Sequence, residues 1–262
     1  MSRRLRQFGI LAALAGCVLT PDALAEPSEF PPSKMYATAW GLTLAGDGTG
    51  FYNDLATFIL EGLSIDYEIR PYRRAMRHFF ETQDSCLYPK SVASLLRTKE
   101  VPTNAGFIDS IPIQKTFVAV FTMPGRPVIE NATDLKGKRV AYAMGSKVPE
   151  YLGPDGVFFI AVADEVNKAE MLLSGRVDVL VANLPDVGMV YQHLKAPMPN
   201  YDPSFQPFAA ARSRFLCHDT PGNQAFMDQL NHRIKSLRIS GALANFYRGN
   251  GLDPDLYLKL ED

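Results

Sequence analysis

The chain of 262 residues has only three cysteines, and after its N-terminal region it has no long apolar stretch and no run of basic residues. So few cysteines exclude a small disulfide-rich scaffold, and without a CxxC pair or a Cys/His cluster a zinc site has no support. With a formal net charge of −1, the sequence does not indicate the basic surface that binding of nucleic acid requires. The hydrophobic fraction of 47% is instead typical of a globular protein with a substantial core.

Motifs for catalysis are also missing. The four histidines lie on different predicted elements, without a Ser or Cys nucleophile motif beside them: His78, His193, His218 and His232. No Gly-rich phosphate loop of the Walker type is present, so the chain is not expected to hydrolyse ATP. The sequence therefore predicts no enzyme, no metal site and no cofactor.

The N-terminal region is typical of a secretory signal over residues 1–25. Three arginines among the first six residues precede an apolar run over residues 8–19, and a small-residue cleavage motif follows at residues 23–25. This run is too short to span a membrane, which takes about 20 residues. Residues 14–17 also resemble a lipobox, so lipidation of Cys17 is the alternative to simple cleavage. Both outcomes place the folded chain outside the cytoplasm, and we expect it in the periplasm.

Beyond a Pro- and Ser-rich tether over residues 26–34, short apolar runs alternate with helical periodicity. The first set of elements comprises strands over residues 34–40, 65–70 and 86–88 and helices over residues 51–60 and 75–81. The second set comprises strands over residues 117–121, 139–143, 157–162 and 177–181 and a helix over residues 169–173. A Pro-rich connection, a strand within residues 208–217 and helices over residues 223–237 and 241–248 follow. This alternation predicts an α/β protein with mostly parallel sheets.

Four sequence motifs, in the same order along the chain, resemble those of the bacterial extracellular solute-binding proteins of family 3, the amino-acid-type receptors of import transporters. They cover nearly the whole chain after the signal: G-x-x-x-D-L-A at residues 50–56, D-L-K-G-K-x-V at 134–140 with Gly145-Ser146 after it, L-x-x-G-R-V-D at 172–178, and L-x-x-x-G-x-x-x-x-x-Y at 237–247.

The resemblance implies a two-lobed periplasmic-binding-protein-like fold of type II, with two crossover strands and a ligand cleft between the lobes. We expect residues 35–117 and 205–262 to form the first lobe and residues 118–204 to form the second. Closure of such a cleft is a hinge motion that a ligand stabilises when it contacts both lobes.

Candidate ligand-binding residues of the first lobe follow from two segments. The stretch Pro71 to Ala75 resembles a P-W-x-R-A segment found in a subset of the family, where Tyr72 would offer a flat face and Arg74 a fork of donors. Ser94 and Arg97 keep the spacing of the family's T-x-x-R, which fixes a ligand carboxylate. Around it this chain departs from the pattern, with Leu95-Leu96 for Pro-Glu, Cys86 for Asp and Gln83 for Gly.

The remaining candidates lie at the ends of predicted strands. Tyr88 ends the third strand, and Trp40 ends the first, where it would wall the ligand or belong to the core. On the second lobe Ser146 should open a helix whose amides face the cleft, or serve only as its N-cap. Asn183 takes the position where the family often presents a group to a ligand amine, and Asp186 is the neighbouring candidate for that role.

Cys86 and Cys217 are the two cysteines beyond the signal. In an oxidising compartment they would pair, and two buried free thiols are an equal alternative, because sequence does not place their Cβ atoms.

Three functions remain open. The first is a periplasmic receptor, expected to be a monomer, that delivers a small carboxylate-bearing solute to the membrane permease of an ABC importer. The second is an enzyme on the same fold, similar to cyclohexadienyl dehydratase. The third is a sensory binding protein that presents its closed form to a receptor. No nucleic-acid partner is expected, and fold alone does not separate the three.

Overall fold

The computed structural model describes residues 32, 34–104, 106–153 and 155–260. The predicted secretory signal, Cys17 and most of the tether lie outside these described residues.

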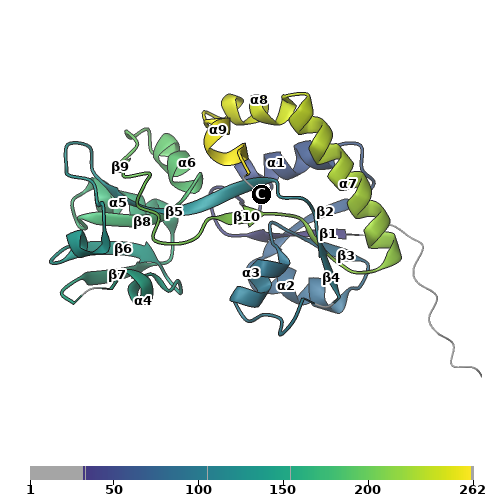
Figure 1. Cartoon of the computed structure of the whole chain (residues 1–262), viewed down its shortest axis with the longest axis horizontal. Coiled ribbons are helices and arrows are strands. Elements are labelled where there is room, and N and C mark those ends of the chain that lie inside the picture. The colour runs from purple at the N-terminus through teal and green to yellow at the C-terminus, as the bar shows by residue number, and fades with distance from the viewer. Residues whose placement is uncertain (1–31, 33, 105, 154, 261–262) are drawn as a thin grey trace, which may run out of the picture.

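Two mixed β-sheets form the framework, and each lies in its own half of the molecule (Figure 1). We name the half built on the sheet β2-β1-β3-β11-β4 the first lobe. Its strands are β1 (Lys34–Ala39), β2 (Asp66–Pro71), β3 (Ser85–Tyr88), β4 (Phe107–Asp109) and β11 (Leu216–His218). The second lobe contains the sheet β10-β5-β8-β6-β7, with β9 paired to β5. Its strands are β5 (Gln114–Thr122), β6 (Arg139–Ala143), β7 (Phe158–Val162), β8 (Val179–Leu184), β9 (Asn200–Tyr201) and β10 (Ala211–Ser213).

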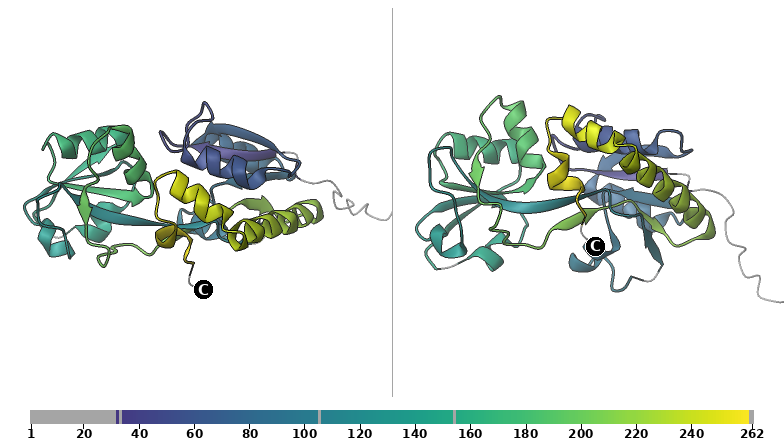
Figure 2. Two further views of the ribbon diagram at one scale, coloured as in Figure 1. Left: turned by 90° about the horizontal axis from the view of Figure 1, so that it is seen from above. Right: turned by 45° about the horizontal axis from the view of Figure 1, so that its top comes forward.

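Helices cover both sheets, and the C-terminal helices return to the first lobe (Figure 2). Those of the first lobe are α1 (Phe51–Leu60), α2 (Tyr72–Glu81), α3 (Val92–Arg97), α7 (Pro221–Ile239) and α8 (Ala242–Gly249). The last helix, α9 (Pro254–Leu258), packs against α8 and against β5 at the crossing. Those of the second lobe are the 3-10 helix η1 (Ala132–Leu135), α4 (Val148–Leu152), α5 (Glu165–Leu173) and α6 (Asp186–His193). Within the described part of the chain, no helix combines the length and the apolar character needed to cross a bilayer.

The predicted fold class is confirmed, and two details of the prediction were wrong. The sheets are mixed rather than mostly parallel, because β5 and β11 run antiparallel to β8 and β3 while β1 pairs parallel to β2 and β3. The single strand expected within residues 208–217 is two short strands, β10 and β11, which belong to different sheets. Arg214 and Phe215 separate them, so the chain changes lobes at this point.

Two chain segments connect the lobes. The long strand β5 extends from the second lobe toward the first, and β10 pairs with its beginning through Ala211 opposite Thr116 and Ser213 opposite Gln114. The pairing joins the outgoing and the returning segments into one antiparallel ribbon at the crossing. The residue limits expected for the two lobes stay a prediction.

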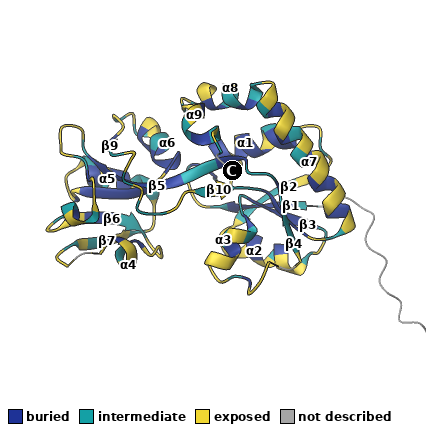
Figure 3. Cartoon of the chain, viewed as in Figure 1, coloured by how far each residue is buried: buried dark blue, intermediate teal, exposed yellow. Residues whose placement is uncertain are grey.

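The core of the first lobe follows from the helical periodicity of α1. Leu55 and Ile59 are fully buried, and Phe58 stacks on Phe246 of α8 with ring centroids 5.0 Å apart. Gly50 precedes α1 with φ of 103°, and a Cβ there would come within 2.5 Å of the Leu42 carbonyl oxygen. Only glycine fits that position, which explains the first residue of the motif. In Figure 3 the central strands β1, β3 and β8 are mostly buried, and α7 exposes its outer side.

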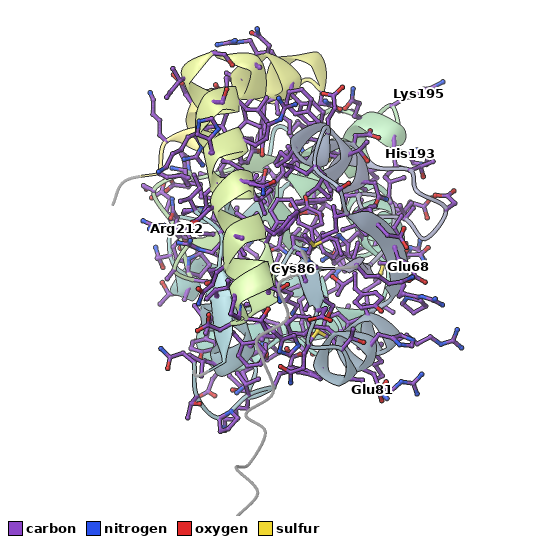
Figure 4. The ribbon with its side chains drawn as sticks, turned by 90° about the vertical axis from the view of Figure 1, so that its right-hand side faces the viewer. Glu68, Glu81, Cys86, His193, Lys195 and Arg212 are labelled. Atoms are coloured by element: carbon purple, nitrogen blue, oxygen red, sulfur yellow. A yellow bond between two sulfur atoms is a disulfide. The ribbon has the colours of Figure 1, made fainter. Side chains whose placement is uncertain are left out.

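A disulfide joins Cys86 of β3 to Cys217 of β11, which lie 131 positions apart in the sequence. The two residues lie opposite each other in the antiparallel pair, with Cα atoms 4.1 Å apart, and both are fully buried. Figure 4 labels Cys86 among the interior side chains. Of the two alternatives that the sequence left open, the structure contains the paired form. The bond fixes the returning C-terminal part of the chain to the first lobe.

Two of the sequence motifs meet at one ion pair. Arg139 begins β6, and its Nε and Nη2 donate to the two carboxylate oxygens of Asp178 at 3.0 and 2.8 Å. The Arg139 backbone N–H also donates to Asp178, and its Nη2 donates to the Gly175 carbonyl. These hydrogen bonds lower the pKa of Asp178 to about 2. The pair connects the start of β6 to the turn before β8, so these motif residues serve the fold of the second lobe.

We expect Asp178→Asn to lower the free energy of unfolding at pH 7 by about 0.5 kcal/mol, because both side chains are partly exposed and solvent screens the pair. A lowered pKa means that the contribution is present above the unfolded pKa and is lost as pH falls through about 2. Urea unfolding at pH 7 and at pH 3 checks this. The difference between wild type and variant should be smaller at pH 3, and an equal or larger difference there would contradict it.

Candidate functional site

A cavity of about 650 Å³ lies where the lobes meet the crossing segments. Its walls come from three sources: the first lobe, the ribbon of β5 and β10, and the second lobe. The residues that line it are Trp40, Tyr52, Pro89, Lys90, Ser91, Ala93, Ser94, Arg97, Thr116, Ala163, Glu165, Asn183, Asp186, Ala210, Ala211, Arg212, Ser213 and Arg214. A concave site between two bodies that can move is a typical ligand position.

The segment after β3 supplies two cations, Lys90 and Arg97. The Lys90 side chain is mostly buried, with its Nζ 2.9 Å from the Tyr72 hydroxyl, 4.7 Å from the Tyr72 ring centroid and 4.0 Å from Glu100. Burial lowers the pKa of Lys90, Glu100 opposes that shift, and Arg97 adds to it. Within the described residues, Arg97 has no hydrogen-bond or ion-pair partner. Its guanidinium is therefore available to a ligand.

Three of the backbone N–H groups at the start of α3, those of Ser91, Val92 and Ser94, already have partners within the protein. The Ser91 hydroxyl accepts from the Ser94 N–H at 3.1 Å, and the Ser94 hydroxyl accepts from the Ser91 N–H at 3.1 Å. Asp109 of β4 accepts from the Val92 N–H at 3.0 Å. With these donors satisfied, the chemistry of this wall lies in its side-chain cations rather than in the helix terminus.

The returning segment supplies two more cations, Arg212 in β10 and Arg214 just after it. Residues two apart in an extended strand point to the same side, and both arginines line the cavity. The Arg214 guanidinium donates to the Ser110 carbonyl, which holds the side chain in place. Burial lowers the pKa of Arg214, and the nearby Asp109 carboxylate opposes that shift.

The second lobe offers polar and acidic groups at the carboxyl ends of its strands. In the otherwise buried strand β8, Asn183 is the exposed residue. Glu165 begins α5 just after β7, and its carboxylate accepts from Lys168 Nζ at 2.8 Å. Lys168 is 1% exposed and also donates to the Val181 carbonyl at 3.2 Å. The ion pair with this buried lysine holds the Glu165 carboxylate in place, and Glu165 lines the cavity while Lys168 does not.

Asp186 connects the two lobes at the edge of the cavity. Its Oδ1 accepts from the Thr43 hydroxyl at 2.6 Å, and its Oδ2 accepts from the Tyr52 hydroxyl at 3.2 Å. Trp40 Nε1 donates to the Thr43 hydroxyl at 2.9 Å, so the first-lobe donors form a chain that ends on this carboxylate. Burial raises the pKa of Asp186, and these hydrogen bonds oppose that shift.

Five of the nine predicted ligand-binding residues line the cavity: Trp40, Ser94, Arg97, Asn183 and Asp186. The hydroxyl of Ser94 is engaged in the cap of α3, and both oxygens of Asp186 accept hydrogen bonds from the first lobe. Ligand binding by any of the five stays a prediction.

The other four predicted residues do not line the cavity. Arg74 is exposed on α2, because that helix begins at Tyr72, three residues earlier than expected, and turns Arg74 to solvent. Tyr72 lies outside the lining and contacts Lys90 instead. Tyr88 is fully buried in the core, where it stacks on Phe215 at 4.7 Å. Ser146 is exposed and does not cap a helix, because α4 begins at Val148 after Lys147.

The sequence interpretation missed Lys90, Glu165, Arg212 and Arg214, which all line the cavity. One signal was available for Glu165, because it directly follows a strand end, where ligands of α/β sheets bind. The spacing of Arg212 and Arg214 showed that they share a face, but only the change of lobe between β10 and β11 shows that this face borders the cavity.

Among the described residues no group of His, Cys, Asp and Glu has the arrangement of a metal site. What the cavity presents is a basic wall on the first lobe and the ribbon, facing an acidic and amide-bearing wall on the second lobe. This arrangement can hold a small solute with an anionic end and a polar or cationic end.

The fold is that of the two-lobed periplasmic-binding-protein-like proteins of type II. The L-cystine solute receptor of Neisseria gonorrhoeae, in its unliganded open conformation, has a TM-score of 0.59 at 16% identity, covering 82% of this chain and 90% of that one. A histidine kinase sensor domain with similarity to periplasmic binding proteins has a TM-score of 0.58 at 15% sequence identity. The match covers 84% of this chain and 96% of that one. The substrate binding protein of an amino acid ABC transporter has a TM-score of 0.55 at 18% sequence identity. That match covers 82% of this chain and 96% of the other.

Sequence comparison adds one relative. The chain is 28% identical over 147 residues to a protein of Shewanella frigidimarina (strain NCIMB 400) described as a sensor. The match covers 54% of this chain and 22% of that protein, so the chain spans about a fifth of the length of this curated relative. No protein-family model matches the chain.

Proposed function

We propose that the chain is an exported solute-binding protein that captures a small carboxylate-bearing polar solute, an amino acid or a related compound, between its two lobes. One observation carries the proposal: Arg97 of the first lobe and Asn183 and Glu165 of the second lobe line the same interlobe cavity. Among the described residues Arg97 has no hydrogen-bond or ion-pair partner. A guanidinium binds a carboxylate through two parallel hydrogen bonds, and an acid or amide opposite it suits an ammonium group.

A thermal-shift screen of the protein against amino acids and small organic acids tests this function. A ligand at about a hundred times its Kd stabilises the folded state by about 2.7 kcal/mol, so a true ligand gives a clear shift. We expect at least one carboxylate-bearing compound to raise the melting temperature in proportion to the logarithm of its concentration. If no compound of either class does so, the proposal is wrong.

The expected anchor is Arg97. We predict that Arg97→Ala weakens binding of that compound about 100-fold or more, as measured by calorimetry, because a carboxylate would lose a charge-assisted partner in a closed site. Arg74→Ala is the matched control, since it removes the same charge from the exposed face of α2 and should leave the Kd within about twofold. Equal affinities of wild type and Arg97→Ala would refute the anchor.

The destination of the captured solute divides two versions of the proposal. Delivery to the permease of an ABC importer is the first version. The similarity to a protein described as a sensor favours presentation of the closed form to a receptor as the second. A deletion strain separates them: loss of uptake of the identified solute supports import, whereas intact uptake with a lost transcriptional response to that solute supports sensing.

An enzyme of the dehydratase type would need a protonated carboxyl group in the cavity that can act as a general acid. Asp186 has a raised pKa, but its two oxygens accept hydrogen bonds from Thr43 and Tyr52. We therefore expect no product from prephenate incubated with the protein. Turnover that Asp186→Asn abolishes would favour the enzyme instead.

A further inference from the structure

Two hydrogen bonds join the lobes directly at Asp186, the first residue of α6. The Thr43 hydroxyl donates to its Oδ1 at 2.6 Å, and the Tyr52 hydroxyl donates to its Oδ2 at 3.2 Å. All three residues are buried, with Asp186 8%, Thr43 4% and Tyr52 2% exposed. Water competes little for buried hydrogen bonds to a carboxylate, so this contact can affect how the lobes are arranged relative to each other.

The acceptor lies close to the ribbon that joins the lobes. Strand β8 ends at Leu184, which pairs with Phe117 of β5, and Asp186 follows two residues later. Nearer to its beginning, β5 pairs with β10. Helix α6 lies on the side of the second lobe that faces the first (Figures 1 and 2). A rotation of the second lobe about the ribbon would therefore move Asp186 toward or away from its donors.

The donors on the first lobe are fixed relative to each other. The Tyr52 N–H donates to the Thr43 carbonyl at 2.9 Å, and Trp40 Nε1 donates to the Thr43 hydroxyl at 2.9 Å. The rings of Trp40 and Tyr52 meet edge to face, with centroids 4.9 Å apart. Because the Thr43 hydroxyl accepts from Trp40, its single hydrogen is free to point at Asp186. The first lobe thus presents two positioned hydroxyls to one carboxylate.

The contact forms part of the cavity edge without occupying the cavity. Tyr52 and Asp186 both line the cavity, whereas Thr43 lies outside the lining. If the lobes separated at this edge, both hydrogen bonds would break and the cavity would widen between Tyr52 and Asp186. A solute that contacts both lobes binds with an apparent affinity that falls with the fraction of protein whose lobes are together.

We propose that the hydrogen bonds of Asp186 to Thr43 and Tyr52 form an interlobe latch that keeps the lobes in the binding arrangement. In this proposal Thr43 is a positioning residue for solute affinity, and it acts through Asp186 rather than by contact with the solute. The part that concerns affinity rests on the proposed function. The latch itself is testable in the absence of any solute.

Small-angle X-ray scattering of the free protein tests the latch. Thr43→Val keeps the shape of the side chain and removes the hydroxyl, so we expect the lobes to move apart and the radius of gyration to increase. Tyr52→Phe removes the other donor and should also increase it. Thr43→Ser keeps a hydroxyl and should retain the wild-type radius. Radii of Thr43→Val and Tyr52→Phe that are equal to or smaller than that of the wild type would overturn the latch.

Thr38→Val is the matched control. Thr38 is 1% exposed, and its hydroxyl donates to the Tyr88 carbonyl at 3.4 Å within the first lobe. The substitution removes a buried threonine hydroxyl from the same lobe without a change at the interlobe contact. The radius of gyration should therefore stay at the wild-type value. An increase equal to that of Thr43→Val would show that any lost buried hydroxyl has this effect, and would overturn the inference.

Calorimetric titrations test the positioning role of Thr43. The probes are L-glutamate, L-glutamine and L-arginine, together with the compound that gives the largest shift in the thermal screen. For each probe that binds the wild type, we expect Thr43→Val to raise the Kd about tenfold and Thr38→Val to leave it within about twofold.

The outcomes separate the latch from the proposed function. A Kd that Thr43→Val leaves unchanged, together with an increased radius, would overturn the positioning role and support the latch. If no probe binds and the thermal screen fails, the proposed function is wrong, and the positioning role is overturned with it. The scattering experiment still decides the latch in that case.

Discussion

Replacement of both paired cysteines, Cys86→Ala with Cys217→Ala, is expected to lower the free energy of unfolding by about 2–5 kcal/mol. The disulfide closes a loop of 131 residues, and a crosslink over such a span strongly restricts the unfolded chain. It also joins adjacent strands at the centre of the first sheet, so its loss acts on the first lobe. Urea unfolding followed by tryptophan fluorescence suits this measurement, because Trp40 belongs to that lobe.

Wild-type protein unfolded in the presence of a thiol reductant provides the control, because it breaks the same bond without a change of sequence. Its unfolding midpoint should approach that of the double variant. If the two lobes unfold in separate steps, loss of the disulfide should lower the urea midpoint of the first-lobe transition, which Trp40 reports. The midpoint of the second-lobe transition should stay unchanged. Identical midpoints for oxidised, reduced and substituted protein would contradict the predicted role of the disulfide.

The second large effect is expected at Asp186. Substitution Asp186→Ala leaves the Thr43 and Tyr52 hydroxyls without their acceptor, and a buried donor that loses its partner costs about 1–3 kcal/mol. We expect the free energy of unfolding of the unliganded protein to fall by about 2 kcal/mol or more. Tyr52→Phe removes one of the two donors, so the cost should be smaller. Equal stabilities of all three proteins would show that the interlobe bonds contribute nothing.

Asp186→Asn separates the charge from the shape of this group. Burial raises the pKa of Asp186, so its contribution to stability is fully present below the unfolded pKa and is lost as pH rises through the folded value. Relative to Asp186→Asn, the wild type should therefore gain stability as pH falls from 7 toward 4. Urea unfolding at several pH values measures this, and a difference that is independent of pH would contradict it.

The elements that sequence reasoning located well are those whose periodicity matches their burial. The stripe of Leu55, Phe58 and Ile59 gave α1 its bounds, and the apolar strands β6 and β7 were placed within about a residue. The errors lie where tertiary contacts decide. Short strands such as β10 and β11 have too few residues for a periodic signal, and the antiparallel pairings depend on where the returning chain enters each sheet.

The site was harder to predict than the fold, for a physical reason. The resemblance to the motifs of family 3 pointed to Arg97 and Asn183, each of which lies close to a strand in its own segment, and both line the cavity. The cavity also needs groups from Lys90, Glu165 and Arg212, which come from segments far apart in the sequence. Tyr88 shows the opposite error, since a polar aromatic residue at a strand end was expected in the cleft and is packed against Phe215.

The position of β11 has a consequence for how the protein acquires its structure. This strand comes from the last fifth of the chain, yet it lies between β3 and β4, which come from the first half. During synthesis from the N-terminus, the first lobe cannot close its sheet until residue 218 is available, whereas the second lobe has its principal strands much earlier. Assembly should thus begin in the middle of the chain, and the N-terminal portion must wait for the C-terminal one.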